Sequence, residues 1–187
     1  KRIFSKDKSA YDSLLSAAKK LTSQGVRAVT GDCGFMAIFQ NRLANDLKVP
    51  VFLSSMLQVP FINKMIGKNE KVGIITANAK SLDDEKLLSE VGINHRDDLI
   101  IKGLENKENF NKSIIEEVGV LESELIKKEV VETAEDMIDE NPNVKSILLE
   151  CSVLPPYAKA VQDKIGLPVF DYITMINYVY STIVQKE

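Results

Sequence analysis

The sequence predicts an α/β protein whose strands run parallel. Apolar runs of strand length alternate along the chain with segments whose apolar residues recur at helical spacing, an order typical of βαβ units. The alternation restarts after the polar segment 67–70 (GKNE), which indicates a boundary there. In addition, a segment around the first cysteine recurs around the second. Together these three observations predict an α/β chain with an internal repeat.

The first half is expected to alternate strands with helices. Apolar residues recur at helical spacing between Tyr11 and Leu21, and Gly25 is placed to end that helix. β-branched residues favour a strand directly afterwards. The expected segments are, in order, a short strand at 1–4, the helix that Gly25 ends, a strand at 26–30, a helix at 35–47, a strand at 49–53 and a helix at 56–66.

The second half repeats the alternation with a longer helical region. Ser81 is expected to cap a helix, Gly119 to interrupt the longest one, and Pro142 to stop it. The expected segments are a strand at 71–76, a helix at 81–90, a strand at 99–102, a helical region at 108–139, a strand at 144–149, a helix at 156–165, a strand at 167–172 and a helix at 175–185.

Composition excludes several classes of function. The 187 residues carry a net charge of -3 with no basic stripe, so nucleic acid is not expected as a partner. No apolar run approaches the roughly 18 residues of a membrane span, and no signal peptide is recognisable. Two cysteines are too few for a disulfide scaffold, and the single histidine, His95, excludes a multi-histidine metal site. We therefore expect a cytoplasmic protein with reduced thiols, no metal and no membrane partner.

The most specific feature is the repeat around the two cysteines. Cys33 is followed, after sixteen intervening residues, by the Pro50 of a VPVF segment; Cys151 is followed at the same distance by the Pro168 of an LPVF segment. Both cysteines stand where an apolar strand gives way to a helix. Because the repeat includes both cysteines of the chain, it favours two structurally equivalent positions for them.

Equivalent positions for two thiols predict a particular chemistry. Ligands of parallel α/β sheets bind outside the carboxyl ends of the strands, which is where both thiols are expected. If a pseudo-two-fold axis relates the halves, the thiols face one bound molecule from opposite sides. One thiolate can then remove a proton from a carbon while the other thiol delivers one to the opposite face. Amides at helix N-termini are expected to lower the pKa of a thiol there and to bind a carboxylate.

Simpler interpretations compete with this one. A single cysteine at a strand end is most often a core residue. A redox pair is disfavoured because no C-x-x-C motif is present. Glu150, directly before Cys151, can tune the thiol of its neighbour, but we expect it to be satisfied locally, because adjacent strand residues point to opposite faces.

The motifs around the cysteines resemble those of the aspartate/glutamate racemase family, and most closely its racemase-like branch. The resemblance extends from about residue 25 to residue 180. It implies two pseudo-symmetric Rossmann-like αβα lobes with parallel sheets and an active-site cleft between them, cofactor-independent chemistry by a cysteine pair, and a homodimer. The segments that carry it are 30–35 (TGDCGF), 52–55 (FLSS), 72–76 (VGIIT), 149–152 (LECS) and 155–158 (PPYA).

The resemblance also implies which residues form the site. Cys33 and Cys151 correspond to the acid–base pair. The other implied positions are substrate-binding, either through backbone N–H groups or through hydroxyl and amide side chains. They are Gly34, Phe35, Ser54, Ser55, Thr76, Asn78 and Ser152. No histidine follows Cys151, unlike in many members.

The sequence therefore predicts a racemase or isomerase of a small carboxylate substrate, such as aspartate or glutamate, that needs neither pyridoxal phosphate nor another cofactor. The alternatives are a non-catalytic carboxylate-binding or regulatory protein on the same scaffold, and an enzyme similar to maleate isomerase or hydantoin racemase. We expect residues 1–66 together with 174–187 to form the first lobe, without its N-terminal strand, and residues 67–173 to form the second.

Overall fold

Two parallel sheets organise the protein, which we describe from a computed structural model covering residues 8–185. The strand predicted at 1–4 lies outside the described residues. One sheet has two strands in the order β1-β2, and the other has four in the order β4-β3-β5-β6. Every strand pair within them is parallel. The predicted α/β class is therefore confirmed.

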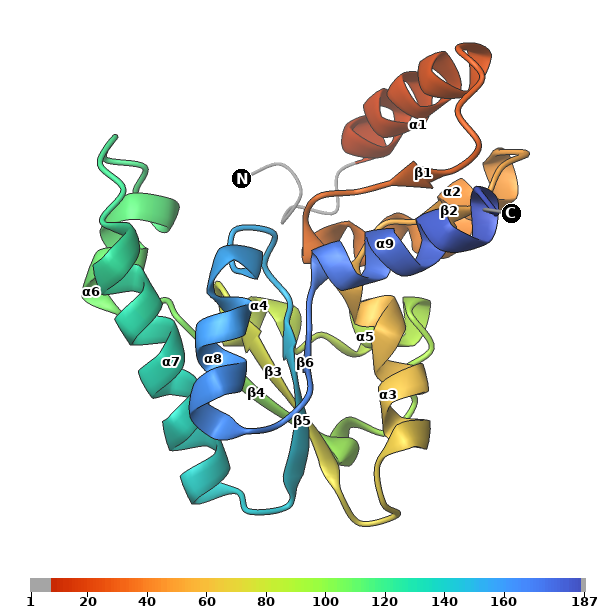
Figure 1. Ribbon diagram of the computed structural model, residues 1–187. Helices are drawn as coiled ribbons and strands as arrows, with labels where there is room; N and C mark the ends of the chain where they lie inside the picture. The colour runs from red at the N-terminus through yellow and green to blue at the C-terminus, as the bar shows by residue number, and fades with distance from the viewer. Residues whose placement is uncertain (1–7, 186–187) are drawn as a thin grey trace.

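The two-stranded sheet lies in the upper part of Figure 1, beside helix α9 (Tyr172–Ile183). The sheet consists of β1 (Val29–Thr30) and β2 (Val51–Phe52), with α1 (Lys8–Ser23) and α2 (Gln40–Asp46) packed around it. Its core joins buried residues of both helices, such as Tyr11 and Leu43, to Val29 and Leu53. The C-terminal helix is attached here, since the Arg27 side chain donates a hydrogen bond to the carbonyl of Ile183.

The four-stranded sheet is covered on both faces. Helices α7 and α8 lie on one side and α3 and α5 on the other (Figure 1). Ile74 of β3 packs toward α3 and α5, whereas its neighbour Ile75 packs toward α7 and α8. Double coverage explains the apolar runs at 72–75, 99–101 and 147–149 in these strands. The elements are α3 (Val59–Met65), β3 (Lys71–Thr76), α4 (Ala79–Leu82), α5 (Glu85–Glu90), β4 (Leu99–Gly103), α6 (Glu108–Phe110), α7 (Ser123–Glu140), β5 (Val144–Leu149), α8 (Ala158–Ile165) and β6 (Val169–Phe170).

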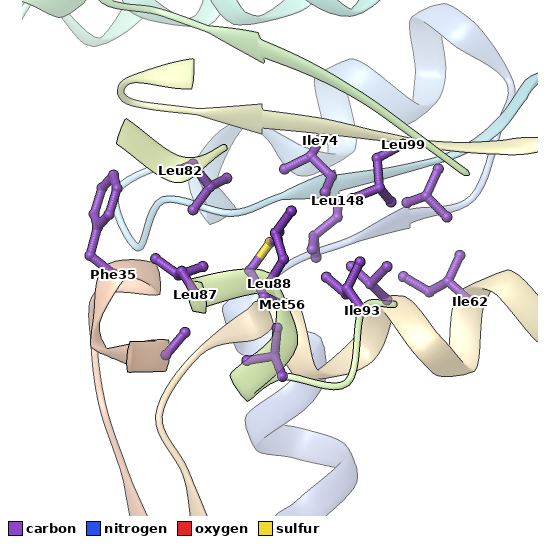
Figure 2. Packing of buried hydrophobic residues seen from close by; sticks show 14 residues of the cluster. Phe35, Met56, Ile62, Ile74, Leu82, Leu87, Leu88, Ile93, Leu99 and Leu148 are labelled. Atoms are coloured by element: carbon purple, nitrogen blue, oxygen red, sulfur yellow. The ribbon is translucent and has the colours of Figure 1, made fainter. Parts of the chain in front are cut away.

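A shared hydrophobic cluster joins the segment after β1 to the larger sheet. Phe35 and Met56 come from the 3-10 helices η1 (Gly34–Phe39) and η2 (Ser55–Gln58). They pack with Leu87 and Leu88 of α5 and with the apolar side chains that the sheet presents on this face (Figure 2). This cluster fixes the position of the Cys33 loop relative to β3 and β5.

The repeat predicted from the sequence is present as a repeated strand ladder. Val51 pairs with Val29, four residues before Cys33, and Val169 pairs with Ile147, four residues before Cys151. The carbonyl of each proline accepts a hydrogen bond of 2.9 Å, Pro50 from Val29 and Pro168 from Ile147. In both copies, therefore, the cysteine lies four residues after the residue that pairs with the valine following the proline.

Several predicted helices differ from those observed. The helix expected at 35–47 begins as a 3-10 segment, and so does the one expected at 56–66. The helix expected at 81–90 is two short helices, because Asn78 and Asp84 each cap a separate N-terminus. The long region at 108–139 is divided into α6, a π-helical turn and α7, with left-handed backbone at Glu117 and Gly119 between them.

The last helix begins three residues earlier than expected. A capping box at Asp171 and Thr174 starts it at Tyr172. Over residues 8–185, the structure contains no helix with both the length and the apolar character that a membrane crossing requires.

Candidate active site

Cys33 and Cys151 stand at the carboxyl ends of β1 and β5, the equivalent strands of the repeat. Each cysteine carbonyl accepts a hydrogen bond from the N–H three residues further on, Met36 at 2.9 Å and Leu154 at 3.0 Å. Both side chains are half-buried and neither forms a disulfide. The local turns are thus alike, as the repeat predicts.

The predicted lowering of the thiol pKa values is wrong. Backbone N–H groups do point at the sulfurs and act to lower their pKa, from Phe35 and Met36 at Cys33 and from Ser152 and Val153 at Cys151. Burial outweighs them, because removing a thiolate from water disfavours its charge. The pKa of Cys33 is therefore raised, and that of Cys151 is raised to about 12.

The two thiols and Glu150 lie within electrostatic reach of one another. The charge of Cys33 raises the pKa of Cys151, and the charge of Glu150 raises the pKa of both cysteines. These effects are secondary to burial, but they require the acidic groups from the two copies of the repeat to share one region.

Glu150 is a functional candidate that the sequence pattern ranked below a purely local role. Its carboxyl group is buried, with only 2% of the residue exposed, and accepts a 2.6 Å hydrogen bond at Oε2 from the Thr76 hydroxyl. The other oxygen, Oε1, has no hydrogen-bond partner and lies against Gly34, where a β-carbon would stand 1.2 Å from it. Burial raises the pKa of Glu150 to about 7, although the Thr76 hydrogen bond acts to lower it.

The expectation that Glu150 is satisfied locally is therefore wrong. Its side chain contacts Gly34, the residue that follows the cysteine of the other copy. Glu150 still continues the strand ladder, since its N–H donates to the Ile75 carbonyl at 2.8 Å, but its side chain is covered by Gly34 of the other copy and does not reach water. A signal was available, since a carboxylate that directly follows the apolar run 147–149 has little access to water.

Two hydroxyl residues predicted for the site face Glu150. Thr76 donates to its carboxylate, and Ser55 donates to its backbone carbonyl at 3.1 Å. Ser54 instead accepts from the N–H of Met56 and caps η2. All three residues are buried. Their roles toward a substrate stay predictions.

The remaining predicted residues have mainly structural contacts. The Phe35 ring belongs to the hydrophobic cluster of Figure 2, while its N–H is directed at Cys33. Asn78 accepts a hydrogen bond from the Ser81 N–H at 2.8 Å and caps α4. Ser152 is half-buried and offers its N–H to Cys151. Within residues 8–185, no three His, Cys, Asp or Glu side chains are grouped so that they could bind a metal ion.

Comparison with solved structures places the protein in the racemase-like α/β fold. The chain is similar to the crystal structure of allantoin racemase from Pseudomonas fluorescens, with a TM-score of 0.63, 18% identity, and coverage of 94% of this chain and 70% of that one. For an aspartate racemase homologue from Pyrococcus horikoshii the TM-score is 0.61, with 21% identity and coverage of 91% and 74%. For unliganded arylmalonate decarboxylase the TM-score is 0.60, with 16% identity and coverage of 97% and 79%.

The curated proteins that are similar in sequence are named lyases and not racemases. Dimethylsulfoniopropionate lyase 5 of Emiliania huxleyi is 33% identical over 177 residues, which cover 88% of this chain and 35% of the lyase. Lyase 3 of the same organism is 32% identical over 179 residues, 92% of this chain and 46% of the lyase. The dimethylsulfoniopropionate lyase of Durusdinium sp. clade D is 31% identical over 158 residues, 83% and 52%.

The chain thus spans between about a third and a half of the length of these curated relatives. No model of a known protein family matches it. The relatives and the structural neighbours are named as enzymes of several kinds, which indicates an enzyme.

The prediction of an amino-acid racemase is wrong. The racemase resemblance is confirmed for the fold, but relatives similar over most of the chain are named lyases. Racemisation and elimination can begin with the same step, in which a thiolate removes a proton from the carbon next to a carboxylate; they differ in whether that carbon is then reprotonated or a double bond forms. The residue pattern therefore does not distinguish the two reactions.

Proposed function

We propose that this chain is a lyase acting on dimethylsulfoniopropionate or a closely similar sulfonium carboxylate, with its reaction centre at Cys33 and Cys151. The observation that carries the proposal is the 31–33% identity to three dimethylsulfoniopropionate lyases over 83–92% of the chain. The cysteine pair supports it, because a lyase for such a substrate needs a base near its carboxylate.

The substrate has a carboxylate at one end of a three-carbon chain and a positively charged dimethylsulfonium group at the other. A thiolate removes a proton from the carbon next to the carboxylate, and the thiol S–H bond forms. The electron pair of the broken C–H bond becomes the new C=C bond, while the C–S bond breaks and its electrons stay on sulfur. The products are acrylate, neutral dimethyl sulfide and a protonated thiol, which returns its proton to solvent.

This reaction needs one base, since the sulfide leaves without taking a proton. Cys33 is the better candidate, because the pKa of Cys151 is raised to about 12 and its thiolate is the harder one to form. The positive sulfonium group would favour a nearby thiolate and offset part of the cost of its burial. Cys151, as a neutral thiol on the other copy of the repeat, would contact the substrate from the side opposite to Cys33.

Other parts of the proposal concern partners. A small carboxylate is the proposed ligand, nucleic acid and membrane are not proposed as partners, and a homodimer is the proposed assembly. The proposed reaction transfers a proton and breaks one bond with no change of redox state at an external acceptor, so we propose that it uses no cofactor.

The direct test is to incubate the purified protein with dimethylsulfoniopropionate, to measure dimethyl sulfide in the headspace by gas chromatography and to measure acrylate by NMR. We expect both products in equal amounts, and their loss in Cys33→Ser. Circular dichroism establishes that each protein is folded. A folded wild-type protein that releases neither product would overturn the proposal.

A further inference from the structure

Glu150 is a buried acid that has no part in the proposed elimination. Its Oε2 is bound by the Thr76 hydroxyl at 2.6 Å, and its Oε1 is buried without a partner. Both backbone polar groups of Glu150 are hydrogen-bonded: its N–H donates to the Ile75 carbonyl at 2.8 Å, and its carbonyl accepts from the Ser55 hydroxyl at 3.1 Å. A side chain held this firmly with one oxygen unpaired has a position that the fold specifies.

That position connects the two cysteine loops. Glu150 precedes Cys151 in the chain, and its Oε1 occupies the space beside Gly34, directly after Cys33. Only a glycine permits this approach, because a β-carbon on residue 34 would stand 1.2 Å from Oε1. The carboxyl group thus lies between the two copies of the repeat.

The acidic groups around Glu150 oppose one another electrostatically. Cys151 adjoins it on its own strand end, Cys33 faces it from the loop before η1, and the exposed Asp32 acts on Cys33 from the same loop. β3 and η2 contribute the hydroxyl groups of Thr76 and Ser55. Like charges repel strongly in a buried region of low dielectric. An ionised Glu150 therefore raises the free energy of a neighbouring thiolate, and a thiolate does the same to an ionised Glu150.

We propose that Glu150 is the positioning residue that carries the negative charge of the site at rest and takes up a proton when a thiol ionises. In this step the S–H bond of the thiol breaks and an O–H bond forms on Glu150, so the charge moves from carboxylate to sulfur. After the thiolate has taken the substrate proton and become a thiol again, it is Glu150 that releases its proton to solvent, which restores the resting site. The unpaired Oε1 is the oxygen available for that proton. The inference rests on the proposed function only for the statement that a thiolate is the reactive group.

The first test measures thiol ionisation without any turnover. The rate of alkylation by iodoacetamide is recorded against pH for the wild type, for Glu150→Gln and for Glu105→Gln, a half-buried glutamate outside the cluster. Because a neutral amide no longer opposes the thiolate, we expect Glu150→Gln to react roughly three- to tenfold faster at pH 7.5 and its midpoint to move to lower pH. Glu105→Gln should follow the wild type. An unchanged or slower reaction in Glu150→Gln overturns the proposal.

The second test uses the hydrogen bond that stabilises the ionised carboxylate. Thr76→Val removes the donor and should increase the protonated fraction of Glu150, so alkylation at pH 7.5 should be faster than in the wild type, whereas Thr76→Ser should resemble the wild type. This pair keeps the proposal testable if Glu150→Gln does not fold. Equal rates for Thr76→Val and Thr76→Ser would contradict it.

A reciprocal measurement separates coupling from a merely structural effect. If charge is shared, alkylating the thiols with iodoacetate, which leaves a fixed negative charge in the site, should move the infrared carboxyl titration of Glu150 to higher pH, whereas the neutral product of iodoacetamide should leave it near that of the wild type. Equal titrations for the two alkylated proteins would contradict the proposal. All these readouts are independent of dimethyl sulfide release, so the lyase proposal and this one can fail separately.

Discussion

The carboxyl group of Glu150 lies against the backbone of Gly34, in the space where any other residue would place its β-carbon. This contact joins the residue before one cysteine to the residue after the other. The site is therefore held together by a direct contact between the two copies of the repeat, in addition to the hydrophobic cluster behind it.

Gly34→Ala should destabilise the protein through this contact. The added methyl group would stand 1.2 Å from Oε1 of Glu150, which must then move within a buried site. We expect a loss of about 1–3 kcal/mol in the free energy of unfolding, measured by urea denaturation. In a Glu150→Ala background the same substitution should cost much less, since the opposing atoms are gone. Equal costs in the two backgrounds would show that the clash is not the cause.

The two cysteines should differ in their importance for catalysis. If Cys33 is the base, Cys33→Ser should lower the rate of dimethyl sulfide release on the order of a hundredfold or more, because a hydroxyl is far less acidic than a thiol. Cys151→Ser should lower kcat less than Cys33→Ser does, and it should raise KM more. The reverse order, measured by steady-state kinetics on folded proteins, would assign the base to Cys151.

The fold was predictable because the parallel strands are buried on both faces. The strands at 71–76 and 144–149 contain the apolar runs 72–75 and 147–149, and their boundaries in the structure agree with the prediction. Helices were harder, because a capping side chain can start a new helix inside a continuous periodic pattern. Asp84 does so in the middle of the helix expected at 81–90, and the apolar spacing on either side carries no sign of it.

The site was predictable only in part. The repeat locates Cys33 and Cys151, since it reflects a ladder register that the structure repeats at β1–β2 and β5–β6. The thiol pKa direction was not predictable, because it depends on how deeply the tertiary structure buries each sulfur. The functional role of Glu150 was ranked too low for a related reason: its contact with Gly34 crosses between the copies and leaves no local pattern.

The start of α9 offers a test of local helix capping. Asp171 is buried, its Oδ1 accepts from the Thr174 N–H at 2.7 Å, and its own N–H donates to the Thr174 hydroxyl at 2.9 Å. Asp171→Ala should lower the free energy of unfolding by about 1 kcal/mol, whereas Asp171→Ser, which can still cap, should cost less. Equal losses for the two variants in urea denaturation would argue against the cap as the source of the stabilisation.

Stability should fall between about pH 4.5 and pH 7 because of Glu150. Its pKa is about 7 in the folded protein and 4.5 as its ordinary value, so across this window the folded state keeps a proton that the unfolded state has released. Since the folded state binds more protons, stability decreases as pH rises, by roughly 3 kcal/mol for this group, and then levels off. Urea denaturation of the wild type at several pH values should show the decline, and Glu150→Gln, which cannot titrate, should show a shallower one. Parallel curves for the two proteins would mean that Glu150 ionises at its ordinary pKa and that its burial imposes no such cost.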